Sequence, residues 1–230
     1  MLKNKKTIGM VVAMEKEIAP LVNELGGLVN TFNVCGFTIK QFNKNGNDIY
    51  LINSGIGEIS ASSATAILIG VYKCDFIINF GVCGALTKST GVLETVFVNG
   101  VVHYDFDLSA IDNVSACQYP SYDNAVIKVD NSILDYAQKT YPLVKSVICA
   151  SADKFLEDTA IKKHLNETYN AQICDMESAG IVLVCNNANV PVLMLKAVSD
   201  GEGGAEEYNN MVKKAVEAYK AITLNIIEAF

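Results

Sequence analysis

The chain has 230 residues, of which 50% are hydrophobic and 19% charged, and its formal net charge is −7. This size and composition predict one α/β domain, residues 1–230, with a substantial core. The negative charge argues against nucleic acid or an anionic membrane surface as a partner. All 18 basic residues are lysine, so no guanidinium fork is available to grip phosphate or carboxylate.

Cysteine and histidine usage gives no sign of a disulfide framework or a metal centre. The seven cysteines are scattered without a Cys-x-x-Cys pair, and His103 and His164 are isolated. We therefore expect reduced thiols, a cytoplasmic location, and neither a metal nor another cofactor. The apolar run after MLKNKK is short, and Glu15 and Glu17 follow where a signal peptidase site would need small residues. No apolar run approaches the length of a membrane span.

Predicted strands and helices alternate along the chain. Short apolar runs predict strands at residues 7–13, 75–80, 93–102, 143–150 and 192–198, with another around Ile173. Asn45-Gly46 predicts a hairpin between residues 37–42 and 48–53. Helices are predicted at residues 18–25, ending at Gly26-Gly27, and at 58–72, 131–140, 157–166, 176–187 and 206–230. This alternation predicts an α/β domain with a mixed sheet between helices.

Residues 103–122 form a long, polar and irregular segment that carries four aromatic side chains. A loop of this length within a compact domain is usually functional. We expect it to be a lid or a subunit contact.

Three acids stand where apolar segments change direction. Glu17 follows the first strand, Glu177 lies in the first turn of a helix that is apolar almost all round, and Asp200 follows the strand at 192–198. Ligands of open α/β sheets bind beyond the carboxyl ends of the strands, so we expect the three acids to share one crevice. Glu15 competes with Glu17, and one of the two is expected to be merely solvated or favoured by the helix dipole.

Each acid taken singly also has a structural explanation. Asp175 or Ser178 is a candidate N-cap, and an acid in a first helical turn is favoured by the helix dipole. Asp200-Gly201 is compatible with an ordinary turn. The argument for a functional site therefore depends on the three acids being found together.

Seven short motifs occur in order along essentially the whole chain. They are A-M-E-x-E (13–17), S-G-I-G (54–57), N-x-G-x-x-G-x-L (79–86), D-x-D-x-[ST]-A (105–110), S-x-D-x-F (151–155), M-E-S-A (176–179) and A-V-S-D (197–200). Together they resemble the 5′-methylthioadenosine/S-adenosylhomocysteine nucleosidases of the nucleoside phosphorylase superfamily. The resemblance implies a single three-layer αβα sandwich with a mixed, partly barrelled central sheet.

The resemblance implies a role for each acid in hydrolysing the N-glycosidic bond of an adenine nucleoside. Glu17 matches the residue that activates water, and Met176 and Glu177 match the pair that holds the ribose. Asp200 matches the acid that protonates purine N7, oriented by a serine that matches Ser199. The chemistry needs such residues, because charge develops on both the ribose and the departing base.

The resemblance also implies contacts to the purine and a homodimer that takes part in methionine salvage. Phe155 and Leu156 match positions that stack on the base and present backbone groups to it, and Gly84 matches another backbone contact. Two positions depart from the family pattern: Val82 stands where a serine is common, and Lys196 where an arginine is common.

Two further sequence features bear on the site. Lys196 is expected either to keep a carboxylate ionised or to reach solvent from a strand end. The loop 201–207 looks shortened, and Tyr208 is a candidate to cover the 5′ substituent.

Two other functions fit the same motifs. A phosphate-dependent purine nucleoside phosphorylase would need a cationic cradle, which the absence of arginine disfavours. A non-catalytic nucleoside-binding protein of the same fold would keep the pocket without turnover. Hydrolysis remains the favoured expectation.

Overall fold

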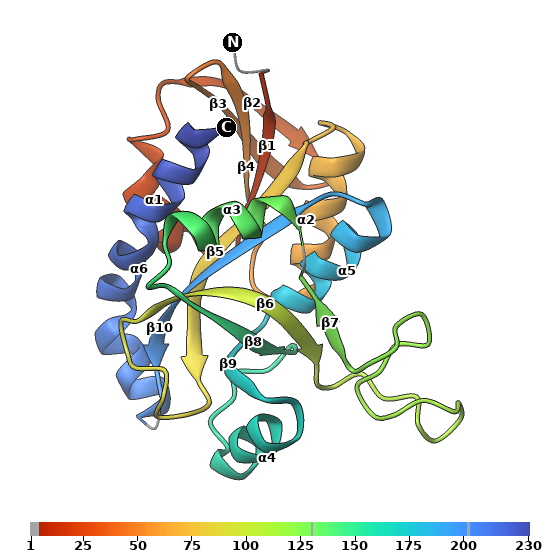
Figure 1. Cartoon of the computed structure of the whole chain (residues 1–230). Helices are drawn as coiled ribbons and strands as arrows, with labels where there is room; N and C mark the ends of the chain where they lie inside the picture. Colours follow the sequence, from red (N-terminus) through yellow and green to blue (C-terminus); the bar gives the residue numbers. More distant parts are fainter. Residues whose placement is uncertain (1–4, 130, 202) are drawn as a thin grey trace.

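The computed structural model describes residues 5–129, 131–201 and 203–230, and Figure 1 shows how its elements are arranged. Strands and helices alternate along the chain, as the apolar runs predict. The strands are β1 (Thr7–Val12), β2 (Leu28–Val34), β3 (Phe37–Lys44), β4 (Asn47–Asn53), β5 (Phe76–Ala85), β6 (Thr95–His103), β7 (Val126–Lys128), β8 (Lys145–Ser151), β9 (Ala171–Asp175) and β10 (Val192–Asp200). The helices are α1 (Glu15–Val22), α2 (Glu58–Gly70), α3 (Ser132–Thr140), α4 (Thr159–Tyr169), α5 (Ser178–Ala188) and α6 (Gly204–Ala229).

The sheet is mixed and partly closed. Strands β10, β6, β8, β9 and β5 pair in that order, and β5 pairs again with β10, which closes a five-stranded barrel. From β5 the sheet continues through β1, β4, β3 and β2, while β7 pairs with β6. Helices α1 and α6 pack together on one side and α2 and α5 on the other (Figure 1). The predicted three-layer arrangement with a partly barrelled sheet is confirmed.

The central strands are apolar because both of their faces are covered. All nine residues of β10 are buried, as are nearly all of β1 and β5. Parallel strands covered by helices read as continuous apolar runs rather than as alternating ones. The main core joins these strands to α2, α5 and α6, and a smaller cluster lies between β8, β9 and α4.

Two strands have no counterpart in the sequence prediction. β2 lies at the sheet edge with most of its residues exposed, so it lacks an apolar alternation. β7 has only three residues. The first helix also ends earlier than predicted, at Val22, although Leu25 still packs into the core and so accounts for the helical spacing of apolar residues.

The elements around the three acids differ from the prediction by a few residues. β5 continues past Phe80 to Ala85 and β10 reaches Asp200, because the two strands pair up to Gly84 and Asp200. α5 begins at Ser178 and α6 at Gly204. Asp200 is therefore the last residue of a strand rather than part of a turn. Residues 104–125 contain no helix or strand, in agreement with the irregular segment expected there.

Candidate active site

A cavity of about 330 Å³ opens at the carboxyl ends of β1, β5, β9 and β10. The three predicted acids all line it, together with four of the other five predicted site residues. The lining residues are Met14, Glu17, Ile56, Val82, Cys83, Gly84, Phe155, Cys174, Asp175, Met176, Glu177, Ser199, Asp200 and Tyr208. Leu156 is buried beside a small adjoining hollow of about 30 Å³ and does not line the main cavity.

Glu17 is buried and held by two backbone amides. Its Oε2 accepts a hydrogen bond from the Met14 N–H at 2.9 Å, as in a capping box, and its Oε1 accepts one from the Val82 N–H at 2.8 Å. Burial raises the pKa of the Glu17 carboxyl, while the Val82 N–H and the Lys196 ammonium oppose the rise. The hydrogen bond from Val82 to Glu17 comes from the backbone N–H of Val82, so it does not depend on a serine side chain at this position.

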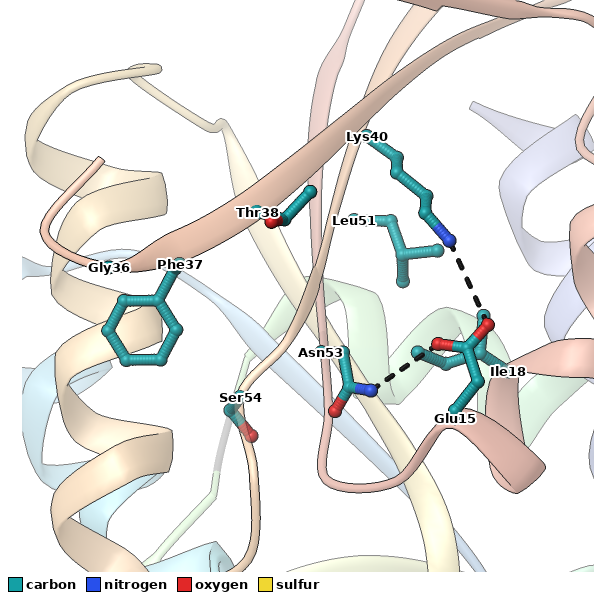
Figure 2. A pocket seen from close by; sticks show the side chains of 9 residues that line it. All are labelled: Glu15, Ile18, Gly36, Phe37, Thr38, Lys40, Leu51, Asn53 and Ser54. Carbon is teal, nitrogen blue, oxygen red and sulfur yellow. Dashed lines mark hydrogen bonds and ion pairs between the residues drawn. The ribbon is translucent and has the colours of Figure 1, made fainter. Parts of the chain in front are cut away.

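Glu15, the competitor of Glu17, points away from this cavity. Figure 2 shows its carboxylate turned toward Lys40, whose Nζ lies 3.8 Å away. The Glu15 side chain is mostly exposed and lines a separate polar hollow between α1, β3 and β4. The structure thus separates the two acids: Glu17 belongs to the cavity, and Glu15 is the solvated one.

Glu177 is the N-cap of α5, not a residue of its first turn as the sequence suggests. The helix starts at Ser178, two residues later than predicted, where the Asp175 carboxylate accepts hydrogen bonds from the N–H and the hydroxyl of Ser178. The Glu177 Oε1 accepts a hydrogen bond from the Gly57 N–H at 3.0 Å. Burial and the neighbouring Asp175 charge raise the pKa of Glu177 to about 7, against the pull of Lys196.

Asp200 lies at the end of β10, beside Gly84 on β5. The Ser199 hydroxyl is 2.8 Å from its Oδ1. Burial raises the pKa of the Asp200 carboxyl, and the hydrogen bond from Ser199 and the charge of Lys162 lower it in part. A carboxyl with a raised pKa is suited to holding a proton for transfer.

Lys196 forms a buried ion pair with Asp175. Their Nζ and Oδ2 atoms are 2.7 Å apart, and the side chains are only 2% and 1% exposed. Burial alone would raise the pKa of Asp175, but the Lys196 ammonium and nearby hydroxyls hold it below its usual value. The expectation that Lys196 keeps a carboxylate ionised is confirmed, with Asp175 as the partner, and the alternative of a solvent-reaching lysine is wrong.

The mouth of the cavity is apolar and aromatic. Phe155 is 42% exposed, and its ring meets the ring of Tyr208 edge-on, with centroids 5.8 Å apart. Tyr208 is fixed by Lys16, whose Nζ is 2.6 Å from the phenol oxygen. Ile56 and Met176 complete this wall. Such a surface suits a flat base and an apolar substituent.

Sequence reasoning missed several residues of the site and its surroundings. Ile56 and Cys174 line the cavity without having been singled out, and Asp175 was read only as a cap. Glu58, which the sequence marks only as the start of the helix predicted at 58–72, is also buried. Its position directly after the S-G-I-G turn, at the start of a helix without other charges, is the signal in the sequence that could have found it.

The described part of the chain has neither a metal cluster nor a membrane-spanning helix. Within residues 5–129, 131–201 and 203–230, no group of three or more His, Cys, Asp and Glu side chains is arranged to hold a metal ion. In the same ranges, no helix combines the length and apolar character needed to cross a membrane.

Comparison with known proteins agrees with this geometry. The family model described as the phosphorylase superfamily matches residues 7–228. A solved 5′-methylthioadenosine/S-adenosylhomocysteine nucleosidase from Helicobacter pylori, with butyl-thio-DADMe-Immucillin-A, shares the fold: the TM-score is 0.92 at 22% identity, over 99% of this chain and 100% of that one. The fold and the match define a member of the phosphorylase superfamily.

Sequence relatives narrow the class. A 5′-methylthioadenosine/S-adenosylhomocysteine nucleosidase of Geobacillus sp. (strain WCH70) is 28% identical over 96% of this chain and 98% of that protein. One of Shewanella sediminis (strain HAW-EB3) is 30% identical over 84% of this chain and 85% of that protein. The chain belongs to the 5′-methylthioadenosine/S-adenosylhomocysteine nucleosidase family.

Proposed function

We propose that this protein hydrolyses the N-glycosidic bond of adenine nucleosides such as 5′-methylthioadenosine and S-adenosylhomocysteine, releasing adenine and the substituted ribose. One observation carries the proposal: Glu17, Glu177 and Asp200 line a single cavity, each in a different electrostatic setting. The names of the sequence relatives support the same activity.

The settings of two acids match the two charges that develop during bond cleavage. Asp200, with its raised pKa, would protonate N7 of the purine and neutralise the leaving base. Glu17, held by two N–H groups, would take the proton of the attacking water and favour the cationic ribose. Pairs of acids with opposite protonation at one pH are typical of such sites.

The remaining side chains would bind the nucleoside. Glu177 would accept hydrogen bonds from the ribose hydroxyls beside Met176. Phe155 would stack on the purine, and Gly84 and Leu156 would offer it backbone groups. The apolar wall at Tyr208 supports a 5′ substituent of alkylthio character.

Water is the favoured nucleophile over phosphate. Lys196, the lysine whose charge acts on both Glu17 and Glu177, is committed to Asp175. The chain has no arginine to build an anion cradle, and Glu17 and Glu177 would repel a phosphate dianion. These features disfavour the phosphorylase alternative.

We also propose that the chain acts as one domain and assembles as a homodimer through the irregular segment 104–125. In this segment Ile111 is 83% exposed, and the Phe106 and Tyr119 rings stack with centroids 3.8 Å apart. Two-fold dimers are the commonest homo-oligomers. A monomer mass in light scattering at micromolar concentration would rule the dimer out.

The free cysteines support a reducing, cytoplasmic setting, where the reaction would serve methionine salvage.

The decisive experiment is a panel of nucleosides assayed with and without phosphate, read by release of free base. Free 5-substituted ribose should form at a rate indifferent to phosphate, and Glu17→Gln should reduce it at least a hundredfold. Glu15→Gln is the matched control, because Glu15 is an exposed acid two residues away and faces the other hollow. Ribose 1-phosphate as the product would identify a phosphorylase, and nucleoside binding without turnover would identify a binding protein.

A further inference from the structure

Glu58 is a buried acid that does not line the cavity. It lies in the first turn of α2, where α2 packs against α5. Its Oε1 is 2.5 Å from the Ser151 Oγ, and its Oε2 accepts a hydrogen bond from the Gly180 N–H at 2.5 Å. Glu58 therefore joins the start of α2 to the start of α5 and to the end of β8.

The protons around Ser151 can be counted. The Ser151 Oγ lies 2.5 Å from the Glu58 Oε1 and 2.6 Å from the Asp175 Oδ1. A hydroxyl has one hydrogen, so it donates to only one of these two oxygens. Two such short contacts are satisfied together when the other carboxyl carries a proton and donates it to the serine.

The surroundings decide which carboxyl carries the proton. Asp175 faces the Lys196 ammonium at 2.7 Å and also accepts hydrogen bonds from the N–H and the hydroxyl of Ser178. Glu58 has no ion pair among the described residues. Asp175 is thus the carboxylate, and Glu58 is the neutral acid that donates to Ser151. In line with this, burial and the Asp175 charge raise the pKa of Glu58 to about 8.

The same contact positions the ribose acid. Gly57, directly before Glu58, has φ 103° and donates its N–H to Glu177, while Glu58 accepts the N–H of Gly180, three residues after Glu177. A Cβ on Gly180 would lie 2.6 Å from the Glu58 carbonyl oxygen, so only glycine allows this approach of the two helices. Glu58 and Gly57 therefore bracket Glu177 from α2.

We propose that Glu58, in its protonated form, is a positioning residue that holds Glu177 and, through Ser151, the Asp175–Lys196 pair in place for catalysis. The proposal rests on the proposed nucleosidase function. Glu58 acts through other residues, since it does not line the cavity.

Loss of the proton would place a new charge among other acids. The groups around Glu58 are Asp175 on β9, Glu177 at the start of α5, Asp153, which accepts the Glu58 N–H, Tyr119 on the 104–125 segment, and Lys196 on β10, already paired with Asp175. Most of these carry or can gain negative charge. Deprotonation should therefore weaken the link to Ser151 and lower activity above about pH 8.

The test compares Glu58→Gln with Glu58→Ala and uses Glu15→Gln as the exposed control. Glutamine supplies the N–H donor and the C=O acceptor of a protonated glutamic acid, so Glu58→Gln should keep kcat/KM within about twofold at pH 7. It should lose the part of the alkaline decline that Glu58 causes near pH 8, while the part set by Asp200 remains. Alanine leaves the Gly180 N–H unpartnered and Ser151 with Asp175 as its one remaining partner among these groups, and we expect kcat/KM to fall on the order of tenfold or more. Glu15→Gln should behave like the wild type in both respects.

Thermal unfolding tests the proton without relying on activity. The folded pKa of Glu58 lies above the unfolded value of 4.5, so its contribution to stability is lost as pH rises from about 4.5 to about 8. Glu58→Gln has no such loss. Its Tm relative to the wild type should therefore rise across this window, on the order of 5 °C, and then level off.

The outcomes separate the two proposals. A Tm difference that stays constant between pH 5 and pH 9, or an alkaline decline of kcat/KM with the same position and size in Glu58→Gln as in the wild type, overturns the role of Glu58. So does unchanged activity of Glu58→Ala. Absence of adenine release by the wild type together with the expected rise in Tm difference overturns the nucleosidase function and leaves the protonated Glu58 established.

Discussion

The two ends of the cavity hold their acids by different means. At one end, Glu17 and Glu177 are fixed by backbone N–H groups, and the buried Lys196 ammonium, paired with Asp175, lowers the pKa of both. At the other end, Asp200 has a side-chain hydroxyl at 2.8 Å and no ion pair among the described residues. Burial raises the pKa of all three acids; backbone N–H groups and the Lys196 ammonium oppose the rise at Glu17 and Glu177, whereas the Ser199 hydroxyl and the Lys162 charge oppose it at Asp200.

Different partners for the acids allow one small cavity to contain a proton acceptor and a proton donor at the same pH. The end with Glu17 and Glu177, where we propose that the ribose binds, gathers N–H groups and an ammonium that offset part of the cost of burying negative charge. At Asp200 the hydrogen bond from Ser199 and the charge of Lys162 offset that cost only in part, so the pKa of this carboxyl stays raised. Breaking either arrangement should have distinct and measurable effects.

The largest effect on kcat should come from removing the acid proton of Asp200. Asp200→Asn keeps the shape of the side chain but cannot donate an acid proton to N7, and we expect kcat to fall a hundredfold or more. Circular dichroism should show an intact fold. Near-normal kcat on 5′-methylthioadenosine would mean that Asp200 is only a strand-end structural residue.

The next prediction concerns the effect of the buried Lys196–Asp175 ion pair on stability. Lys196→Met leaves Asp175 buried without its counter-charge, which should lower the free energy of unfolding by about 3–5 kcal/mol. The control is Lys163→Met, which removes the exposed Lys163–Glu167 pair on α4 and should cost about 0.5 kcal/mol or less. Denaturant titration measures both. Equal losses would show that burial of the Lys196–Asp175 pair has no special importance.

The sequence predicts Glu17, Glu177 and Asp200 better than it predicts the buried Lys196–Asp175 pair and Glu58. Glu17, Glu177 and Asp200 each follow or precede a strongly apolar segment, so the sequence indicates both their burial and their edge of the sheet. The αβα arrangement follows from the same alternation of elements. Strand β2 was missed because its exposed residues carry no periodic apolar signal.

The Lys196–Asp175 pair and the burial of Glu58 depend on contacts that no local sequence pattern reveals. Asp175 and Lys196 are 21 residues apart and meet because β9 and β10 both pair with β5 in a closed barrel. In the sequence, Glu58 is an acid in a first helical turn, a position that the helix dipole favours. Its burial becomes evident only from the structure, where Gly180 of α5 donates its N–H to it. Closure of a barrel and close approach of two helices are tertiary events, so the acids they bury cannot be read from spacing alone.

A smaller effect should appear at the ribose end. Glu177→Gln replaces a carboxylate by an amide with one acceptor oxygen, so contacts to two sugar hydroxyls should weaken. We expect kcat/KM on ribosides to fall about tenfold and to fall less on 2′- or 3′-deoxy analogues. The ratio of the two rates is the measurement. Equal wild-type rates on ribosides and deoxy analogues would exclude a clamp on the ribose.

The smallest effect should come from Ser199→Ala. The Ser199 hydroxyl favours the ionised form of Asp200, so its removal should raise the pKa of Asp200 further above its usual value. Since Asp200 must carry a proton to act, the fall of kcat/KM at high pH should move to higher pH in the variant. Loss of the orienting contact should at the same time lower the maximal kcat by about three- to tenfold.

The pH–rate profile of Ser199→Ala, recorded beside the wild type, tests both parts of this expectation. Glu58→Gln should be included, because its own alkaline effect acts through the opposite end of the cavity. A limb that moves to higher pH in Ser199→Ala but not in Glu58→Gln, beside a separate decline that is lost only in Glu58→Gln, indicates two separate protons, one at each end. A limb that stays unmoved in Ser199→Ala would show that Asp200 does not govern it, and the difference between the two ends would then lie in geometry rather than in protonation.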